Sequence, residues 1–401
     1  MDFPRGYATT HPWISFELNM KKAHPRVWIL IGKAMHGCRL LRESAADPSL
    51  AAEIRSMRRA EAVRGSARME AVSLSDEQLH EILEMGQEDL DRLAMEIQQS
   101  GQYEGGSEGE KILVFNIIRL FLFLSGELSR IRENPDIRTE AITGINEILH
   151  RGVDTGEARP GSFRTGEIEV DGYAGVNPAE CSQLVDRLTR GIAESRESFP
   201  AGDEIASGLI RAIIAHRYLT WILPFDTGNA LTARFVELQV MLSAGVPQEA
   251  ALFMNSYYSL TQGEYRELLY GDRKGSVFDF MEYCLRGFVK GLEQIAARVE
   301  KSRLPAVWNS CLDRLMGDER DEIAERRKVL VLGIRGHAKG VTPRQVRYAS
   351  PEVTKCYAER SDKTLTRDIS SLVELGVLER ARRRILVNSS LVFPFGSSIK
   401  R

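Results

Sequence analysis

The chain has 401 residues, of which 43% are hydrophobic and 27% are charged. This composition is typical of a soluble globular protein, and the length exceeds that of one ordinary domain, so we expect two or three domains. The 54 basic and 56 acidic residues give a formal net charge of -2, which excludes a strongly basic field over the whole molecule. Any nucleic-acid surface must therefore be local.

The cysteines and the apolar runs exclude further classes of protein. The five cysteines lie far apart and show no CxxC or Cys/His spacing, so a disulfide framework or a zinc site is not expected. No basic segment followed by an apolar run opens the chain, and the longest apolar runs, such as Leu120 to Leu124, are far shorter than a bilayer span. We therefore expect a cytoplasmic protein that does not contact a membrane.

Apolar residues recur at helical spacing through most of the chain, which predicts a mostly α protein. A glycine-rich polar loop at 99–109 separates an N-terminal helical region from the rest of the chain. An irregular stretch at 152–178 contains residues 167–170, in which charged and apolar side chains alternate, and a turn at Asp171-Gly172. This pattern predicts a small β-hairpin.

Helical spacing resumes at Pro178 and continues to about Ala297, with breaks at Gly202 and at 224–228. The segment after Pro305 is rich in charged residues and is predicted to be a helical connector.

The last part of the chain, from Val329, has a different pattern. A helix is followed by a second one that opens at Thr342-Pro-Arg-Gln-Val346, and a third helix is bounded by Ser361 as N-cap and Gly376 at C′. A short strand, a basic turn and a second strand follow at 377–387. This order predicts a helix-turn-helix with a wing.

The third helix and the wing of this region carry short hydroxyls and arginines. Such side chains reach phosphates and base edges, and arginines at a wing meet the DNA backbone or the minor groove. A basic run is also common in a solvated turn, and winged helices also serve as protein-docking modules. We interpret this region as DNA-binding through Thr364, Thr366, Arg367, Arg382, Arg383 and Arg384.

The segment 215–234 is the most informative for chemistry. A helix ends near Pro224, a loop crosses, and Gly228-Asn229 opens a new helix. Free N–H groups at a helix start, beside a glycine that allows close approach, form an anion site. Taken alone, the segment is also consistent with an ordinary helix–loop–helix connection.

This segment resembles the Fic motif His-Pro-Phe-x-(Asp/Glu)-Gly-Asn-Gly-Arg-x-x-Arg. Three other segments resemble Fic proteins in the same order: Ser66-Ala-Arg-Met-Glu70 is similar to the autoinhibitory Ser-x-x-x-Glu helix, 159–168 to the flap that aligns the target, and 259–269 to the helix near the nucleotide base. The resemblance extends over about the first three quarters of the chain. The motif positions in register are Pro224, Phe225, Gly228, Asn229 and Arg234.

The resemblance implies a mostly α fold, with a Fic (Fido) helical core, a small β-hairpin flap and a C-terminal winged helix-turn-helix domain. It implies an inhibitory-type helix with Ser66 and Glu70, and a nucleotide or anion site at Gly228, Asn229, Arg234 and Tyr265. The expected parts are an N-terminal helical region at 1–105, a Fic-like core at 106–300, a helical connector at 301–328 and the winged helix-turn-helix domain at 329–401.

Some motif positions depart from the family pattern. The catalytic histidine falls on Leu223, which cannot accept a proton from a target hydroxyl. The acidic metal ligand falls on Thr227, and the Gly-Arg pair on Ala230-Leu231, which removes a phosphate-binding guanidinium. We therefore expect no catalytic residue, no metal site, and at most weak binding of ATP and Mg²⁺. The alternative uses displaced residues, with His216 as base and Asp226 as metal ligand.

Several of these residues also have structural interpretations. His216 is typical of a packed helix residue, Tyr265 of a core aromatic, and Arg164 of a solvated strand residue as well as a phosphate or target ligand. We expect Glu70 and Arg234 to form a structural clasp rather than a regulatory switch, because a buried ion pair fixes geometry.

Two functions are compatible with these features. The first is a degenerate Fic-domain protein, a pseudoenzyme inactive in standard AMP transfer, that acts as a DNA-binding transcription regulator or a scaffold through its winged helix. The alternative is a protein adenylyltransferase that transfers AMP from ATP to a target hydroxyl through displaced residues. DNA is the expected partner, and a protein target and a homodimer are left open.

Overall fold

The computed structural model describes residues 6–392 apart from 17, 44–47, 86–88, 90–91, 93–106, 154, 198–202, 272–275, 317–320 and 338. The chain forms two compact units, Met1–Ala296 and Ala297–Arg401. The boundary lies inside the helix α14, Val277–Leu315, which continues through Pro305. Most of the loop expected at 99–109 lies outside the described residues, and helix α6 begins at Ser107.

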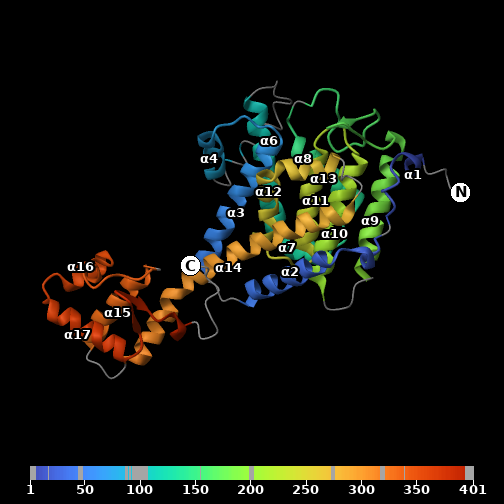
Figure 1. Ribbon diagram of the computed structural model, residues 1–401. Helices are drawn as coiled ribbons and strands as arrows, with labels where there is room; N and C mark the ends of the chain where they lie inside the picture. The colour runs from blue at the N-terminus through green and yellow to red at the C-terminus, as the bar shows by residue number, and fades with distance from the viewer. Residues whose placement is uncertain are drawn as a thin grey trace. The chain divides into compact units, whose positions relative to one another are not determined.

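The first unit consists almost entirely of helices among its described residues (Figure 1). Its elements are α1 Gly6–Thr10, η1 Met20–Lys22, α2 Pro25–Glu43, α3 Pro48–Met69, α4 Asp76–Glu84, α6 Ser107–Gly126, α7 Leu128–Glu133, α8 Thr139–His150, β1 Glu169–Val170, β2 Tyr173–Ala174, η2 Pro178–Glu180, α9 Cys181–Glu197, α10 Glu204–Ile222, α11 Asn229–Ser243, α12 Gln248–Leu260, α13 Gln262–Tyr270 and the first part of α14.

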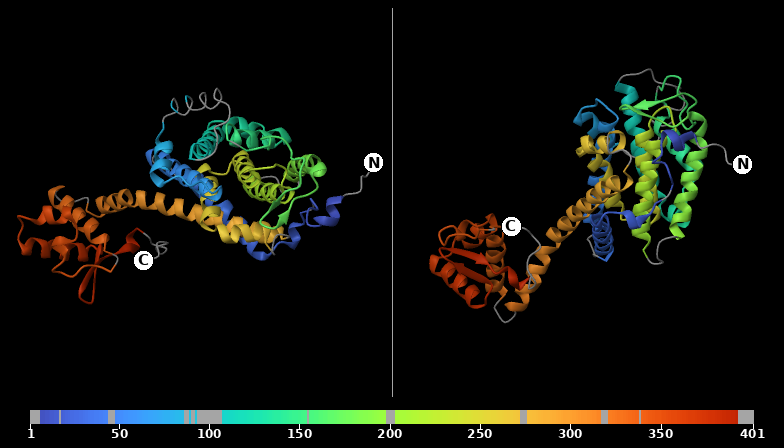
Figure 2. Two further views of the ribbon diagram at one scale, coloured as in Figure 1. Left: turned by 90° about the horizontal axis from the view of Figure 1, so that it is seen from above. Right: turned by 45° about the vertical axis from the view of Figure 1, so that its right-hand side comes forward.

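Helices α10 and α11 occupy the centre of the first unit. They pack against each other, α9 lies along α10, and α12 lies along α3 (Figures 1 and 2). Almost every residue of α10 and α11 is buried, because other helices cover them on all sides. A polar side chain on a helix in this position must find its partner within the protein.

The predicted hairpin is present, but its first strand contains only Glu169–Val170 rather than all of the predicted residues 167–170. Strands β1 and β2 are antiparallel, with Val170 opposite Tyr173. Asp171 and Gly172 have φ values of 52° and 75°, which are the positive values that a type I′ turn requires at both central positions.

The second unit contains the rest of α14 and a three-helix group followed by a hairpin. Strands β3 and β4 are antiparallel, and Val341 forms an isolated bridge to Ile385 on β4. The elements are α15 Asp321–Arg335, η3 Val346–Tyr348, α16 Pro351–Tyr357, α17 Asp362–Glu374, β3 Leu378–Ala381, β4 Arg384–Val387 and η4 Ser389–Leu391.

The predicted ends of α17 are confirmed. The Ser361 hydroxyl accepts a hydrogen bond from the Thr364 N–H at 3.3 Å, and Gly376 follows the helix with φ of 70°. The apolar face predicted for this helix is buried in the core of the unit, through Leu365, Ile369 and Leu372.

The starts of the two preceding helices differ from the prediction. Helix α15 begins at Asp321 rather than near Val329. Thr342 opens a turn and the short η3, and α16 begins only at Pro351, where the Ser350 hydroxyl accepts from the Val353 N–H at 3.2 Å. A serine N-cap followed by proline at the first helical position is a strong start signal, so it prevails over the earlier Thr-Pro pair.

A buried carboxylate joins the three helices of the second unit. Asp368 on α17 is fully buried and accepts hydrogen bonds from Arg326 at 2.7 and 3.2 Å, from Arg327 at 3.3 Å and from the Tyr357 hydroxyl at 2.9 Å. Burial alone would raise the pKa of Asp368, but the hydrogen bonds from Arg326 and Tyr357 lower it below its ordinary value. The carboxylate therefore stays charged inside the unit.

No described helix combines the length and the apolarity that crossing a bilayer would need.

Candidate functional site

The loop at 223–228 connects the two central helices as predicted. Leu223 ends α10 in the left-handed region, with φ of 48°, and Gly228 precedes α11 with φ of 69°. The Asn229 side chain closes the loop, because its oxygen accepts from the Phe225 N–H at 2.9 Å and its amide donates to the Phe225 carbonyl at 2.7 Å. Asn229 therefore fixes the loop rather than pointing outward.

Arg164 holds this loop against the hairpin region. Its guanidinium is buried and donates from Nε to the Leu223 carbonyl at 2.6 Å, from Nη1 to the Gly166 carbonyl at 2.7 Å and from Nη2 to the Val176 carbonyl. Its backbone N–H also donates to the Pro224 carbonyl at 3.0 Å. Both interpretations from the sequence were wrong, since Arg164 is neither solvated nor exposed to a phosphate. Its carbonyl partners come from segments distant in sequence, which no local pattern reveals.

The start of α11 keeps the backbone geometry of an anion site, but an imidazole covers it. No described side chain caps the helix start. However, the ring of His150, the last residue of α8, packs on Gly228: a Cβ added to Gly228 would lie 1.9 Å from the His150 Cε1 atom. The close approach that this glycine permits is therefore made by His150.

His150 is a site residue that the sequence did not reveal. Its Nδ1 lies 2.9 Å from the Asn146 carbonyl, so Nδ1 carries the hydrogen and Nε2 is the acceptor nitrogen of the neutral ring. Burial lowers the pKa of His150, which outweighs the upward effects of that hydrogen bond and of Glu70. The only signal in the sequence is a histidine at the end of an amphipathic helix, one turn after Asn146.

Glu70 and Arg234 meet as expected. Arg234 Nη2 lies 2.7 Å from a Glu70 carboxylate oxygen, and the Arg234 and Glu70 side chains are 1% and 22% exposed, respectively. Burial alone would lower the pKa of Arg234, but Glu70 and Tyr265 raise it. Ser66, one turn before Glu70, donates to the Asn255 side chain at 3.2 Å and so holds α3 against α12. The two residues of the inhibitory-type signature thus anchor α3 at two points.

Tyr265 and His216 belong to a buried polar chain. The Tyr265 hydroxyl lies 2.8 Å from His216 Nε2, and His216 Nδ1 lies 2.9 Å from the Glu237 carboxylate. Tyr258 donates to the same carboxylate at 2.7 Å, and its ring stacks on Tyr265 with 4.8 Å between the ring centroids. Tyr265 is 2% exposed and faces this network rather than an open site. Both ring nitrogens of His216 are engaged, so it is not placed to act as a base.

These residues do not fit a bound ATP–Mg²⁺ complex. The side chain at the histidine position, Leu223, is fully buried, and Asp226 is an exposed carboxylate. No group of three His, Cys, Asp or Glu side chains in the described part of the chain is placed to hold a metal ion. Glu70 pairs with Arg234 through one guanidinium nitrogen, and the His150 ring packs on Gly228, so both positions already contact the protein itself.

The second unit has a separate basic groove of about 690 Å³ between η3, α17 and the β3–β4 hairpin. Of the predicted DNA-binding residues, it brings together Thr366, Arg382, Arg383 and Arg384, whereas Thr364 and Arg367 do not line it. The groove also contains Arg380 of the predicted basic wing, and Arg344, Arg347 and Tyr348, which were not predicted.

The arginines of this groove divide into two groups. Some hold the unit together: Arg347 donates to the Arg360 carbonyl at 3.0 Å, Arg380 to Ser370 Oγ at 3.3 Å and Arg384 to the Gly340 carbonyl at 2.9 Å. In contrast, Arg344, Arg382 and Arg383 are exposed and make no hydrogen bond or ion pair with any described residue. These last three are available to an external anion.

Comparison with solved structures identifies the fold of the chain. The chain is similar to the crystal structure of a Fic family protein from Desulfovibrio desulfuricans G20, with 15% identity, 93% of this chain and 98% of that chain covered, and a TM-score of 0.50. It also matches Fic-1 (residues 134–508) from C. elegans, with 18% identity, 69% and 75% covered and a TM-score of 0.49. A Fic domain containing signaling protein from Bacteroides thetaiotaomicron VPI-5482 matches with 12% identity, 69% and 98% covered and a TM-score of 0.45.

The chain therefore has the Fic fold, and the predicted mostly α core with small hairpins is confirmed. No protein-family model matches the sequence. A comparison with curated proteins also finds no match.

Replacing Glu70 with alanine is expected to destabilise the first unit. The change leaves the Arg234 guanidinium buried without its carboxylate, at a cost of about 2–3 kcal/mol, less than for a fully buried pair because Glu70 is partly exposed. Urea unfolding followed by tryptophan fluorescence measures the difference. The control is Glu81→Ala on α4, an exposed position where the change should stay within about 0.5 kcal/mol. Equal effects of the two variants would show that the clasp does not stabilise the unit.

Lowering the pH is expected to destabilise the first unit through His150. Its pKa in the folded chain lies below the ordinary value of 6.5, so between these two values the unfolded chain binds a proton that the folded chain does not. Stability should therefore fall as the pH drops below 6.5, by at most about 1.4 kcal/mol per pH unit. His150→Gln should reduce this slope in urea unfolding between pH 7.5 and 5.5, and an unchanged slope would show that another group causes it.

Proposed function

We propose that this chain is a DNA-binding regulator whose Fic-fold unit does not transfer AMP. The observation that carries the proposal is the groove of the second unit, where Arg344, Arg382 and Arg383 are exposed and unengaged among the described residues. The order α15, α16, α17 and hairpin is that of a winged helix, in which the third helix and the wing face DNA.

The distribution of charge supports double-stranded DNA as the partner. The whole chain has a net charge of -2, so a cluster of arginines along one groove is a local feature rather than a consequence of composition. Guanidinium groups bind phosphates with fixed geometry, and Tyr348, which is 69% exposed, adds an aromatic surface at the same groove. Of the three α17 residues predicted to bind DNA, Thr366 is the one that lines the groove. We therefore assign Thr366 to contact with base edges.

The interior of the Fic-fold unit supports inactivity. A general base must lie within hydrogen-bond reach of the target hydroxyl, and Leu223 offers none. His216 is engaged at both nitrogens, and Arg234 is paired with Glu70. His216 and Arg234 are the polar groups that would have to replace the lost catalytic residues, and both stabilise the Fic-fold unit instead. We therefore assign this unit the role of a scaffold.

DNA binding is expected to depend on the wing. The unmodified chain should bind random duplex DNA with a Kd on the order of 10⁻⁶–10⁻⁴ M at physiological salt, and Arg382→Ala with Arg383→Ala should weaken binding and lower the salt slope by about 2. Fluorescence anisotropy with labelled duplex across a salt series measures both effects.

The control for this experiment is Arg314→Ala, an exposed arginine of α14 that does not line the groove. The same salt slope in the wing variant and in the unmodified chain would contradict binding through the groove. No binding by the unmodified chain at about 50 mM salt, where the electrostatic attraction is strong, would contradict a DNA partner.

AMP transfer is expected to be absent. Incubation of the unmodified chain and of Glu70→Gly with ATP labelled at the α-phosphate, Mg²⁺ and cell lysate should give no labelled protein, because Leu223 takes the position of the motif's histidine and His216 is engaged at both ring nitrogens. Labelling that is stronger with Glu70→Gly would instead support the alternative, an adenylyltransferase with displaced residues. Asp226→Asn and His150→Gln would then identify those residues. This outcome leaves the DNA result unaffected.

A further inference from the structure

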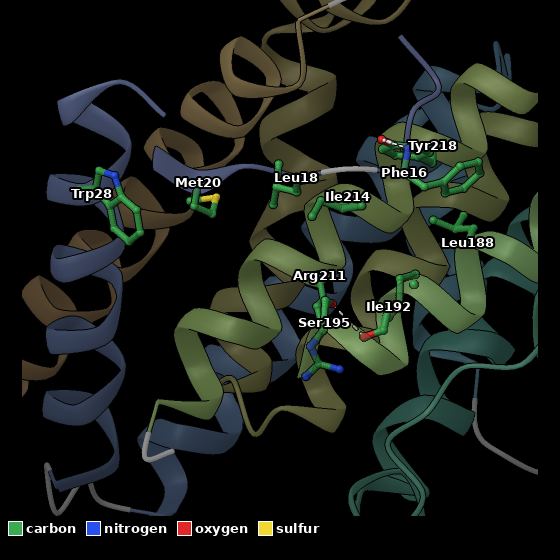
Figure 3. A pocket seen from close by; sticks show the side chains of 11 residues that line it. Phe16, Leu18, Met20, Trp28, Leu188, Ile192, Ser195, Arg211, Ile214 and Tyr218 are labelled. Atoms are coloured by element: carbon green, nitrogen blue, oxygen red, sulfur yellow. Dashed lines mark hydrogen bonds between the residues drawn. The ribbon is translucent and has the colours of Figure 1, made fainter. Parts of the chain in front are cut away.

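The first unit contains cavities that use no residue of the 223–234 segment. One lies between the segment 16–20 and helices α2, α9 and α10 and has mostly apolar walls (Figure 3). Its one charged side chain among the described residues, Arg211, is engaged within the protein, so the charge of this cavity identifies no ligand. Another is a groove of about 700 Å³ at the β1–β2 hairpin, beside α1 and η2. A volume in this range holds small organic ligands.

Three aromatic rings that contact one another form one wall of this hairpin groove. The His11 ring stands at 71° to the Trp13 ring and at 77° to the Tyr173 ring, and the ring centroids are 5.5 and 5.8 Å apart, respectively. The polar atoms of two of these rings are engaged within the protein. The Tyr173 hydroxyl donates to the Trp221 carbonyl at 2.8 Å, and each ring nitrogen of His11 lies within 2.9 Å of a partner. The wall therefore presents aromatic surface to a ligand.

Two carboxylates line the same groove, and no lysine or arginine among the described residues does. Glu167 is exposed and makes no hydrogen bond or ion pair with any described residue. Glu180 is half-buried, and its Oε1 accepts a hydrogen bond from the Tyr7 N–H at 3.1 Å, which fixes this carboxylate beside α1. The groove thus has two carboxylates that form no ion pair with a described side chain.

The buried cation behind the groove is already satisfied. Gly175 lines the groove, and a Cβ added to it would lie 2.8 Å from Arg164 Nη2. The Arg164 guanidinium donates to the carbonyls of Leu223, Gly166 and Val176 and is only 2% exposed. A ligand in the groove therefore meets the carboxylates and the aromatic wall rather than this guanidinium.

We propose that the hairpin groove binds an alkylammonium ion, with the ammonium group at Glu167 and Glu180 and the alkyl chain along the aromatic wall. Carboxylates attract a cation, and so do the faces of aromatic rings. An alkylammonium ion combines this charge with methylene groups that pack against apolar surface. No three His, Cys, Asp or Glu side chains of the described residues are grouped to hold a metal ion, so an organic cation fits the groove better. The proposal goes beyond DNA binding and does not depend on it.

The ligand chemistry is tested on the unmodified chain with three probes that share a six-carbon chain. At pH 7, where the amine is protonated, titration should give a Kd below about 1 mM for hexylamine, at least tenfold weaker binding of hexanol and no detectable binding of hexanoate. Trp13 lines the groove, so tryptophan fluorescence at constant ionic strength follows the binding. Equal affinities for hexylamine and hexanol, or no binding of hexylamine, would overturn the proposal.

A blocked lysine distinguishes two sources of the ammonium group. If Nα-acetyl-lysine methylamide binds as tightly as hexylamine, the site takes a lysine side chain of a protein partner. If it binds at least tenfold more weakly, the site takes a free amine. Either result supports an ammonium site, because the comparison of hexylamine with hexanol decides the charge requirement separately.

The location of the site is tested with matched charge removals on one hairpin. Glu167→Gln should weaken hexylamine binding at least threefold, and Glu167→Gln combined with Glu180→Gln should abolish it, since each carboxylate contributes part of the attraction. The control is Glu169→Gln, which removes an exposed charge two residues away that does not line the groove, and it should leave the affinity unchanged. Thermal unfolding confirms that each variant is folded. Equal affinities of Glu167→Gln and Glu169→Gln for hexylamine would overturn the location.

Discussion

The polar side chains of α10 and α11 have almost no access to water, and this constraint governs the first unit. A buried charge or hydrogen-bonding group destabilises a protein unless it has a partner. His216 on α10 therefore pairs with Glu237 on α11, and Arg234 pairs with Glu70, which directly follows α3. The first pair joins two consecutive helices, and the second joins segments that are distant in sequence. The same partnerships engage His216 at both ring nitrogens and Arg234 with a carboxylate, so these groups serve the packing of the unit.

The loop between these helices has the backbone shape of a phosphate-binding turn, but protein side chains fill the place of the phosphate. Gly228 has positive φ and leads into a helix start, as an anion site requires, but the His150 ring rests on it. Arg164 could serve as a cation, but it donates to carbonyls of the hairpin region and of the loop itself. Both groups thus make contacts within the protein at the loop, His150 on Gly228 and Arg164 on the Leu223 carbonyl.

In the second unit, buried charges also have partners, but several arginines remain exposed at the surface. Arg326 and Arg327 are buried and satisfied by Asp368, which joins three helices. Arginines at the groove are partly engaged with backbone carbonyls, and the remainder are exposed. Positive charge that is not required for folding is thus concentrated on one surface of a chain that is slightly acidic overall. This concentration of charge is the observation on which the proposed DNA binding rests.

The sequence alone determined the features that depend on neighbouring residues, and the tertiary structure decided the rest. Apolar spacing, the Ser361 cap and the Asp171-Gly172 turn correctly predicted helices, a helix end and a hairpin, because these are set within a few residues. The roles of Arg164, His150 and Tyr265 depend on partners in other parts of the chain. Whether such a polar side chain faces water or the core is set by the elements that cover it. Local patterns carry no information about these distant contacts, which is the physical reason that the fold was predictable and the state of the site was not.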